Sequence, residues 1–249
     1  MGLFKGFLMS LGMFSVIPVP KNSWNDRYMP LVIPTLPLVG ALVGLIWYGL
    51  SVMLVKNMTP SLIQGAIVLF IPFLLTGFIH ADGFMDTADA VLSRRGLEEK
   101  KRILKDPNIG AFSVFAIIVV TLSQFCAVQT ILSEHKALIA LIFIPVISRC
   151  VTGVAMLNLK PVFETGYNVS FRNNTKPLHS VFIVLLTVAI LSASRFAPGL
   201  ALPLFTETAA CALTAFYLYK QFDGISGDLC GCIITTGEFA ALVCMAVTR

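Results

Sequence analysis

Residues 31–55 read LVIPTLPLVGALVGLIWYGLSVMLV, a run of 25 residues without a single charged side chain. A helix needs roughly 20 mostly apolar residues to cross the hydrocarbon core of a bilayer. This run is long enough to do so, and it predicts that lipid is the solvent for at least this part of the fold.

The rest of the chain shares this apolar character. Of its 249 residues, 57% are hydrophobic and only 12% are charged, whereas ordinary globular domains carry about 25% charged residues. A soluble fold of this length could not bury so much apolar surface in one core. We therefore expect a single integral membrane domain over residues 1–249. We attribute its net charge of +5 to membrane topology and predict no nucleic-acid partner.

Six further apolar runs are candidates for membrane spans. They cover residues 62–79, 112–132, 137–157, 178–194, 200–219 and 229–247. These runs do not alternate between polar and apolar residues, as the strands of a membrane barrel do. The predicted fold is therefore an all-α, polytopic transmembrane helix bundle of about seven spans. Residues 1–17 form a shorter apolar segment without a signal-peptide cleavage site, which we interpret as an interfacial or re-entrant helix.

Basic residues predict the orientation of the bundle. If the connection around residues 80–111 is cytoplasmic, the other inner connections are 18–30, 158–177 and 220–228. Together these connections hold 12 of the 18 Lys and Arg residues, and the outer segments hold 4. Positive charge in short loops marks the cytoplasmic side. The sequence thus predicts a multi-pass protein of the inner (plasma) membrane whose site faces the cytoplasm.

The most informative stretch of the inner connections reads HADGFMDTAD, residues 80–89. Its aspartates, Asp82, Asp86 and Asp89, are spaced i, i+4 and i+7, which places them on one face of a helix. A bound cation would remove their mutual repulsion, and oxygen ligands suit Mg²⁺ or Mn²⁺. The alternative is an acidic helix start favoured by the helix dipole, which explains Asp82 but not Asp89, two turns in. We therefore predict a Mg²⁺ site.

A second group of acidic residues lies near the end of the chain. Asp228 closes the glycine-rich stretch DGISGD at residues 223–228, and Glu238 follows within the last apolar run. An acid inside a span is a functional candidate, although a hydrogen bond between helices would also explain Glu238. Arg149, in the middle of another apolar run, needs either a carboxylate or a ligand phosphate as its partner.

Basic side chains follow the aspartates within the same connection. They either anchor the protein to anionic lipid or bind a diphosphate. They are Arg94, Arg95, Lys100, Lys101, Arg102 and Lys105. His80 is a candidate base or metal ligand. Metal, carboxylates and cations together indicate phosphoryl-type transfer, and the lack of a G-x-x-x-x-G-K-[ST] loop gives no indication of ATP-driven work.

At these residues the sequence resembles the cobalamin synthase family, also called the adenosylcobinamide-GDP ribazoletransferases. The resemblance covers nearly the whole chain, and its most specific part is residues 80–89, which are similar to the signature H-x-D-G-x-x-D-T-x-D. Weaker elements are residues 14–20, residues 105–110, Ser148-Arg149, Glu164 to Gly166, and residues 224–228 with Glu238. The chain departs from the family pattern in having Pro107 in place of Ser, Asp223 in place of Gly and Thr235 in place of Glu.

The resemblance implies a Mg²⁺-dependent transferase. The 5′ end of α-ribazole, or of its 5′-phosphate, would attack the diphosphate of adenosylcobinamide-GDP. GMP would leave, and adenosylcobalamin or its 5′-phosphate would form. The implied metal ligands are Asp82, Asp86, Asp89, Asp228 and Glu238. The implied catalytic residues are Asp82, Asp86, His80 and Arg149, and the implied substrate contacts are Arg94, Arg95, Lys105, Asp106, Gly110, Glu164 and Gly227. Membrane lipid is a further expected partner, and a homo-oligomer or a complex with other enzymes of cobalamin synthesis stays open.

Two other functions compete with this one. A CDP-alcohol phosphotransferase also uses paired aspartates in a membrane bundle, but its D-G-x-x-A-R motif is absent, because no Ala-Arg follows Asp82-Gly83 at that spacing. A cation or corrinoid transporter would hold its cargo near the bilayer midplane. Most of the acids here lie at the inner ends of spans, and only Arg149 and Glu238 favour transport.

Overall fold

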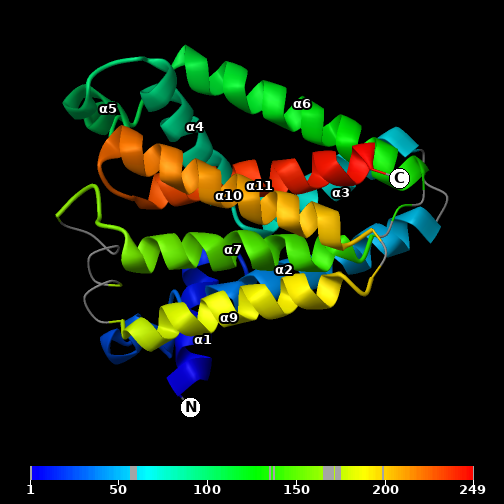
Figure 1. Ribbon diagram of the computed structural model, residues 1–249, viewed down its shortest axis with the longest axis horizontal. Coiled ribbons are helices and arrows are strands. Elements are labelled where there is room, and N and C mark those ends of the chain that lie inside the picture. Colours follow the sequence, from blue (N-terminus) through cyan, green and yellow to red (C-terminus); the bar gives the residue numbers. More distant parts are fainter. Residues whose placement is uncertain are drawn as a thin grey trace.

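The computed structural model describes residues 2–56, 61–134, 136, 138–164, 171, 175–197 and 199–248. Within these residues the chain forms α-helices joined by short connections and no β-strand (Figure 1). The helices are α1 (Gly2–Phe14), α2 (Leu36–Lys56), α3 (Ser61–Leu75), α4 (Ile79–Leu92), α5 (Leu97–Ile103), α6 (Ala111–Ser133), α7 (Ala140–Asn158), α9 (Pro177–Ser194), α10 (Ala201–Phe222) and α11 (Gly227–Val247). Two short 3₁₀ helices, Lys21–Ser23 and Asp26–Leu31, connect α1 to α2.

Six helices, α2, α6, α7, α9, α10 and α11, are long and apolar enough to cross a membrane. The pair formed by α3 and α4 counts as a seventh span if its 88° bend is allowed within one span. The predicted all-α bundle of about seven spans is therefore confirmed. The short apolar helix α1 agrees with the predicted N-terminal helix, and its interfacial position stays a prediction.

The predicted span at residues 62–79 differs from the structure in its shape. The helix α3 ends at Leu75, and Gly77 and Phe78 both adopt positive φ angles of 61° and 62° before α4 begins. Such angles end a right-handed helix and are easy only for glycine. The backbone N–H of Val16 donates to the Leu75 carbonyl at 2.9 Å, so the segment after α1 packs at the bend. The aspartate stretch is thus the start of a new helix in a new direction.

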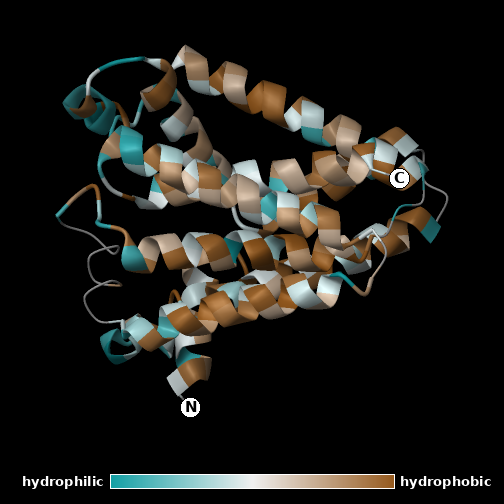
Figure 2. Cartoon of the chain, viewed as in Figure 1, coloured by the Kyte–Doolittle hydropathy of each residue, from teal (hydrophilic) through white to brown (hydrophobic). Residues whose placement is uncertain are grey.

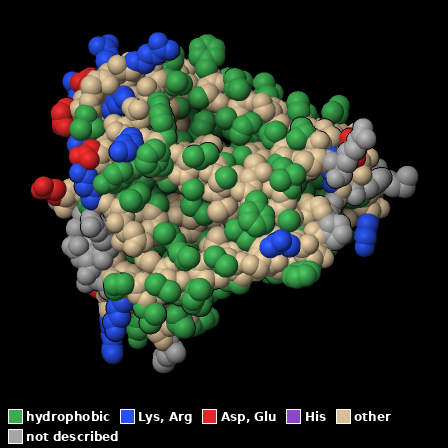
Figure 3. All heavy atoms as spheres, in the orientation of Figure 1, with side chains coloured by type: hydrophobic (Ala, Val, Ile, Leu, Met, Phe, Trp, Pro, Cys, Tyr) green, Lys and Arg blue, Asp and Glu red, His purple; other side chains and the backbone are tan. Residues whose placement is uncertain are grey.

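Polar side chains gather at one end of the bundle. The helix α5, the connection that follows α10 and the residues directly after α7 (159–164) lie together at this end, and α5 is strongly hydrophilic (Figure 2). Lys, Arg, Asp and Glu side chains cover it, whereas hydrophobic side chains cover the flanks (Figure 3). The flanks include exposed Phe115, Leu185 and Leu213, as expected of surfaces that face lipid.

The most enclosed helix is α7. Glycines 40 and 44 of α2 allow this packing, because a Cβ atom at either position would overlap the backbone carbonyls of Pro145 and Ile142. Small residues of this kind let membrane helices approach at backbone distance. As a consequence, the middle of α7 and its Arg149 side chain lie in the centre of the bundle, with Arg149 only 1% exposed.

Candidate active site

Two glycines bring the aspartate helix α4 against the start of α11. A Cβ atom on Gly83 would lie 2.6 Å from the backbone oxygen of Asp228, and one on Gly231 would lie 3.0 Å from the backbone oxygen of His80. Thr235 stabilises the same crossing, because its Oγ1 donates a hydrogen bond to the His80 carbonyl at 3.1 Å. The crossing joins two acidic segments that are about 145 residues apart in the sequence.

Three carboxylates lie near this crossing. Asp82 is exposed and Asp86 is partly buried on α4, while Asp228 is partly buried in the first turn of α11, whose N-cap Ser226 accepts a hydrogen bond from the Leu229 N–H at 3.3 Å. The charges of Asp82, Asp228 and Asp89 all act on Asp86. Within the part of the chain that the structure describes, no cationic side chain forms an ion pair with Asp82, Asp86 or Asp228. The crossing therefore concentrates uncompensated negative charge.

The chemistry of this cluster fits a hard divalent cation. Its donors are carboxylate oxygens, which Mg²⁺ prefers, and their mutual repulsion would be relieved by bound positive charge. Among the described residues, however, no three His, Cys, Asp or Glu side chains already converge closely enough to hold a metal ion. Binding would therefore have to draw the carboxylates together, and the predicted ligands stay predictions.

Asp89 has a structural contact that the sequence did not reveal. Its carboxylate accepts hydrogen bonds from the backbone N–H groups of Gly110 at 2.7 Å and Ser113 at 2.9 Å. Asp89 thus caps the N-terminus of α6 from another helix and satisfies N–H groups that would otherwise lack partners. A Cβ atom on Gly110 would overlap this carboxylate, which gives Gly110 a packing role beside its predicted contact with substrate.

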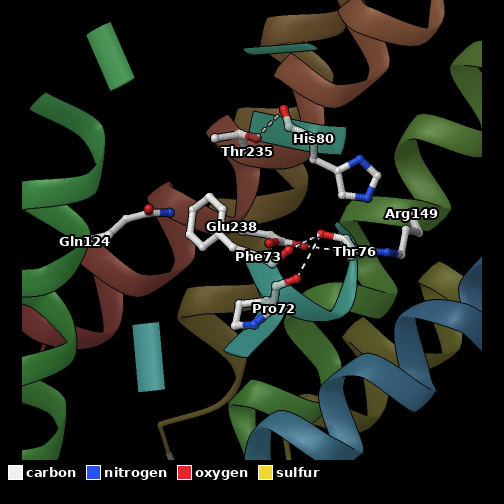
Figure 4. A pocket seen from close by; sticks show the side chains of 8 residues that line it. All are labelled: Pro72, Phe73, Thr76, His80, Gln124, Arg149, Thr235 and Glu238. Carbon is white, nitrogen blue, oxygen red and sulfur yellow. Dashed lines mark hydrogen bonds and ion pairs between the residues drawn. The ribbon is translucent and has the colours of Figure 1, made fainter. Parts of the chain in front are cut away.

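Arg149 and Glu238 form a buried ion pair beneath the aspartates. Arg149 Nη1 lies 2.5 Å from Glu238 Oε1 (Figure 4). Ser148 Oγ donates to the same oxygen at 3.0 Å. The side chains are 1% and 13% exposed. The predicted need of Arg149 for a carboxylate or phosphate partner is met by Glu238. In the structure Glu238 is therefore paired with the Arg149 guanidinium, and its role as a metal ligand stays a prediction.

Glu207 lies near this pair and is an acid within the predicted span at residues 200–219. It is fully buried, and neither carboxylate oxygen has a hydrogen-bond partner within the described residues. Its charge interacts with those of Glu238 and Arg149. A small cavity of about 20 Å³ lies beside the pair, with His80 and Arg149 on one side and Gln124 on the other (Figure 4).

The predicted substrate contacts divide between two places. Lys105 and Glu164 line an open cleft of about 840 Å³ together with Lys101 and Arg102 of α5, and Lys105 Nζ lies 3.8 Å from the centre of the Phe163 ring. Gly227 instead lies beside Asp228 at the start of α11. Arg94 and Arg95 are exposed in the turn after α4. The cleft therefore offers cations and an aromatic face at the same polar end as the carboxylates.

Two further acids at the polar end have local partners. Asp106 accepts hydrogen bonds from the backbone N–H of Asn108 at 3.0 Å and from its side-chain amide at 2.7 Å, and these bonds lower the pKa of Asp106. Asp223 has a φ angle of 55°, a left-handed conformation that favours the glycine of the family pattern. Its carboxylate pairs with Lys160 at 2.7 Å, away from the three-carboxylate cluster. Of the Glu164–Gly166 element, only Glu164 lies within the described residues.

The close crossing of α4 and α11 makes a prediction for Gly83. Alanine should stabilise an exposed helix by about 1 kcal/mol relative to glycine, but at Gly83 its Cβ would press against the Asp228 backbone and separate the helices. We expect Gly83→Ala to lower both the melting temperature and kcat. The matched control is Gly49→Ala in α2, where a Cβ would meet nothing within 4 Å. If Gly83→Ala were as stable and active as Gly49→Ala, the crossing would not position the carboxylates.

Comparison with known proteins gives a consistent result over the whole chain. The model of the family described as cobalamin-5-phosphate synthase matches residues 6–246. A relative from Clostridium botulinum (strain Alaska E43 / Type E3), named adenosylcobinamide-GDP ribazoletransferase, is 37% identical over 244 residues, which are 96% of each chain. A relative of the same name from Clostridium perfringens (strain SM101 / Type A) is 33% identical over 248 residues, 98% of each chain. No solved structure matches the chain.

Proposed function

The chain belongs to the cobalamin-5-phosphate synthase family, and from this premise we propose that it joins adenosylcobinamide-GDP to α-ribazole or its 5′-phosphate, with release of GMP. The relatives carry this activity in their names. Membership makes the chain an enzyme, a transferase of cobalamin biosynthesis. It favours neither of the two competing functions, the CDP-alcohol phosphotransferase or the transporter.

The observation that carries the proposal is the carboxylate cluster of Asp82, Asp86 and Asp228. Asp228 lies where α11 begins after its connection from α10, at the polar end of the bundle (Figure 1), and the uncompensated negative charge there would hold a cation against a phosphorylated substrate. Bound there, Mg²⁺ would neutralise the diphosphate and the charge that develops as its bond breaks. Asp89 caps α6 and Glu238 pairs with Arg149, so the part of these two residues in the ligand set stays a prediction.

The 5′ oxygen cannot be the nucleophile when it already bears a phosphate, so in the proposed reaction a free ribose hydroxyl of the acceptor forms a bond to the phosphorus that bears the cobinamide group. The bond from this phosphorus to the bridging oxygen breaks, and GMP leaves with that oxygen. The chain itself orients both substrates and accepts the proton of the attacking hydroxyl, at His80 or at a carboxylate of the cluster. Arg149 and the cations of the Lys105 cleft would stabilise negative charge on the donor.

The experiment that tests this function uses purified protein in detergent with both substrates and Mg²⁺. We expect a corrinoid of the mass of the joined product, formed with α-ribazole and with its 5′-phosphate at different rates. Chelation of divalent cations with EDTA should stop its formation, and added Mg²⁺ should restore it. Unchanged adenosylcobinamide-GDP in all mixtures would contradict the proposal.

We further propose that the site faces the cytoplasm across the inner (plasma) membrane. The basic residues of α5 and its flanks support this orientation under the positive-inside rule. A single cysteine introduced at Lys100 in a variant without Cys126, the exposed native cysteine, should react with a membrane-impermeant thiol reagent only after the cells are permeabilised. Reaction in intact cells would invert the orientation. The matched control is a cysteine in place of Lys56, the last residue of α2, which should react from outside.

A further inference from the structure

A chamber of about 260 Å³ opens beside the carboxylate cluster. It is lined by the end of α1 and the starts of α2, α4 and α11, with the inner part of α7. Its size is close to the lower end of the roughly 300–1,000 Å³ of pockets that hold small organic ligands. The chamber is separate from the basic cleft around Lys105, with which it shares no lining residue.

Most of the chamber wall is apolar. Met13 and Phe14 come from α1, Met156 from α7 and Ile234 from α11. Flexible thioethers adapt to flat ring systems and make favourable contacts with them, and Phe14 offers a ring for stacking. These walls suit an uncharged aromatic group and disfavour a phosphate.

Two polar atoms of the wall lack partners. Within the described residues, neither Thr152 Oγ1 nor His80 Nε2 has a hydrogen-bond partner, and Thr152 is only 1% exposed. Both residues line the chamber. Buried polar groups are normally hydrogen-bonded, and an unsatisfied one is costly. A ligand with a hydroxyl group or a ring nitrogen would satisfy Thr152 Oγ1, whereas His80 also lines the cavity beside Arg149 (Figure 4).

The carboxylates lie at one side of the same chamber. Asp82 and Asp228 belong to its lining, on the side of the α4–α11 crossing. A ligand whose apolar part fills the chamber therefore places its other end at the cluster. The chamber thus combines three requirements of one molecule: a flat apolar body, a few hydrogen-bonding atoms and a reactive end beside carboxylates.

We infer that this chamber is the binding subsite of the acceptor nucleoside, and this inference rests on the proposed function. The aromatic base lies between Met156 and the α1 residues, the ribose reaches Thr152, and its attacking hydroxyl reaches Asp82 and Asp228. The donor binds elsewhere, because its corrin ring is far larger than a nucleoside and its diphosphate requires the cations at the polar end. The two substrates thus approach the cluster from opposite sides.

The test compares the KM values of the two substrates. The variant Met156→Trp fills the chamber, and we expect it to raise the KM of α-ribazole by at least about tenfold while the KM of adenosylcobinamide-GDP changes less than about twofold. The variant Thr152→Val keeps the shape of the wall and removes the hydroxyl, and it should raise the acceptor KM by about tenfold. The matched control is Met53→Trp on the exposed face of α2, which should change neither value.

A binding measurement separates this inference from the proposed function. Equilibrium binding of α-ribazole to the full-length protein, followed by calorimetry without donor, should be detectable in wild type and about tenfold weaker in Thr152→Val. Failure of GMP release with intact, Thr152-dependent nucleoside binding would contradict the function and keep the subsite. Normal turnover with an unchanged acceptor KM in both variants, or with a raised donor KM alone, would overturn the subsite. Labelling of the chamber by a photoreactive phospholipid, with unchanged nucleoside binding in both variants, would assign it to a lipid chain and also overturn the subsite.

Discussion

Replacement of Asp86 by Asn should lower kcat at least about 10³-fold and leave the protein folded in the membrane. Asp86 interacts electrostatically with Asp82, Asp228 and Asp89, so its charge is one that a bound cation would neutralise. A metal ion that stabilises transition-state charge contributes several kcal/mol, and each 1.36 kcal/mol is a factor of ten in rate. The amide keeps the shape of the side chain and removes its charge.

The same substitution should raise the melting temperature slightly when no divalent cation is present, because it removes one of several mutually repelling charges. Steady-state kinetics and thermal unfolding in detergent measure the two effects. The matched control is Asp26→Asn, an exposed acid whose carboxylate accepts a hydrogen bond from Trp24. A normal kcat in Asp86→Asn would show that no metal ion held by Asp86 takes part in the mechanism. A marked loss of stability with a normal kcat would make Asp86 a structural residue.

The second large effect concerns stability. Replacement of Arg149 by Met leaves Glu238 and Glu207 buried together without a cation, since Arg149 is the partner of the first and acts on the second. Loss of one partner from a buried ion pair costs about 3–5 kcal/mol. We expect Arg149→Met to lower the unfolding free energy by this amount, as measured by unfolding in mixed detergent micelles.

The two partners of the pair should not be equivalent. Glu238→Leu should lower the unfolding free energy less than Arg149→Met does, because Glu207 also interacts electrostatically with Arg149. The double variant Arg149→Met/Glu238→Leu should recover part of the loss, since apolar replacements of a buried pair are often tolerated. If the double variant regains stability but not turnover, Arg149 also acts on the substrate. If the two single variants lost equal amounts of unfolding free energy, Glu207 would not act as a second partner of Arg149.

The sequence predicted those parts of the fold that depend on local composition. Uninterrupted apolar runs identified the helices, and the bias of basic residues toward one set of connections identified the polar end that the structure shows. The spacing of Asp82, Asp86 and Asp89 predicted one helical face, and α4 is indeed a helix over these residues. The family resemblance is confirmed by the match over residues 6–246.

The parts that could not be predicted depend on contacts between distant segments. The bend after Leu75 lies inside an apolar run, where only Gly77 marks a break. The cap that Asp89 provides joins it to Gly110, 21 positions later, and no local pattern reports such a bond. Glu207 lies beside Arg149 because α7, α10 and α11 pack together, and the sequence could identify it only as an acid within a span.

The central claim is that the carboxylate cluster carries out transfer between two substrates, and release of GMP tests it most directly. Purified protein is incubated with adenosylcobinamide-GDP, α-ribazole and Mg²⁺, and each component is omitted in turn. We predict GMP release only in the complete mixture, at a rate that Asp86→Asn lowers at least about 10³-fold. GMP release without α-ribazole, or at an equal rate in the Asp86→Asn variant, would contradict this account.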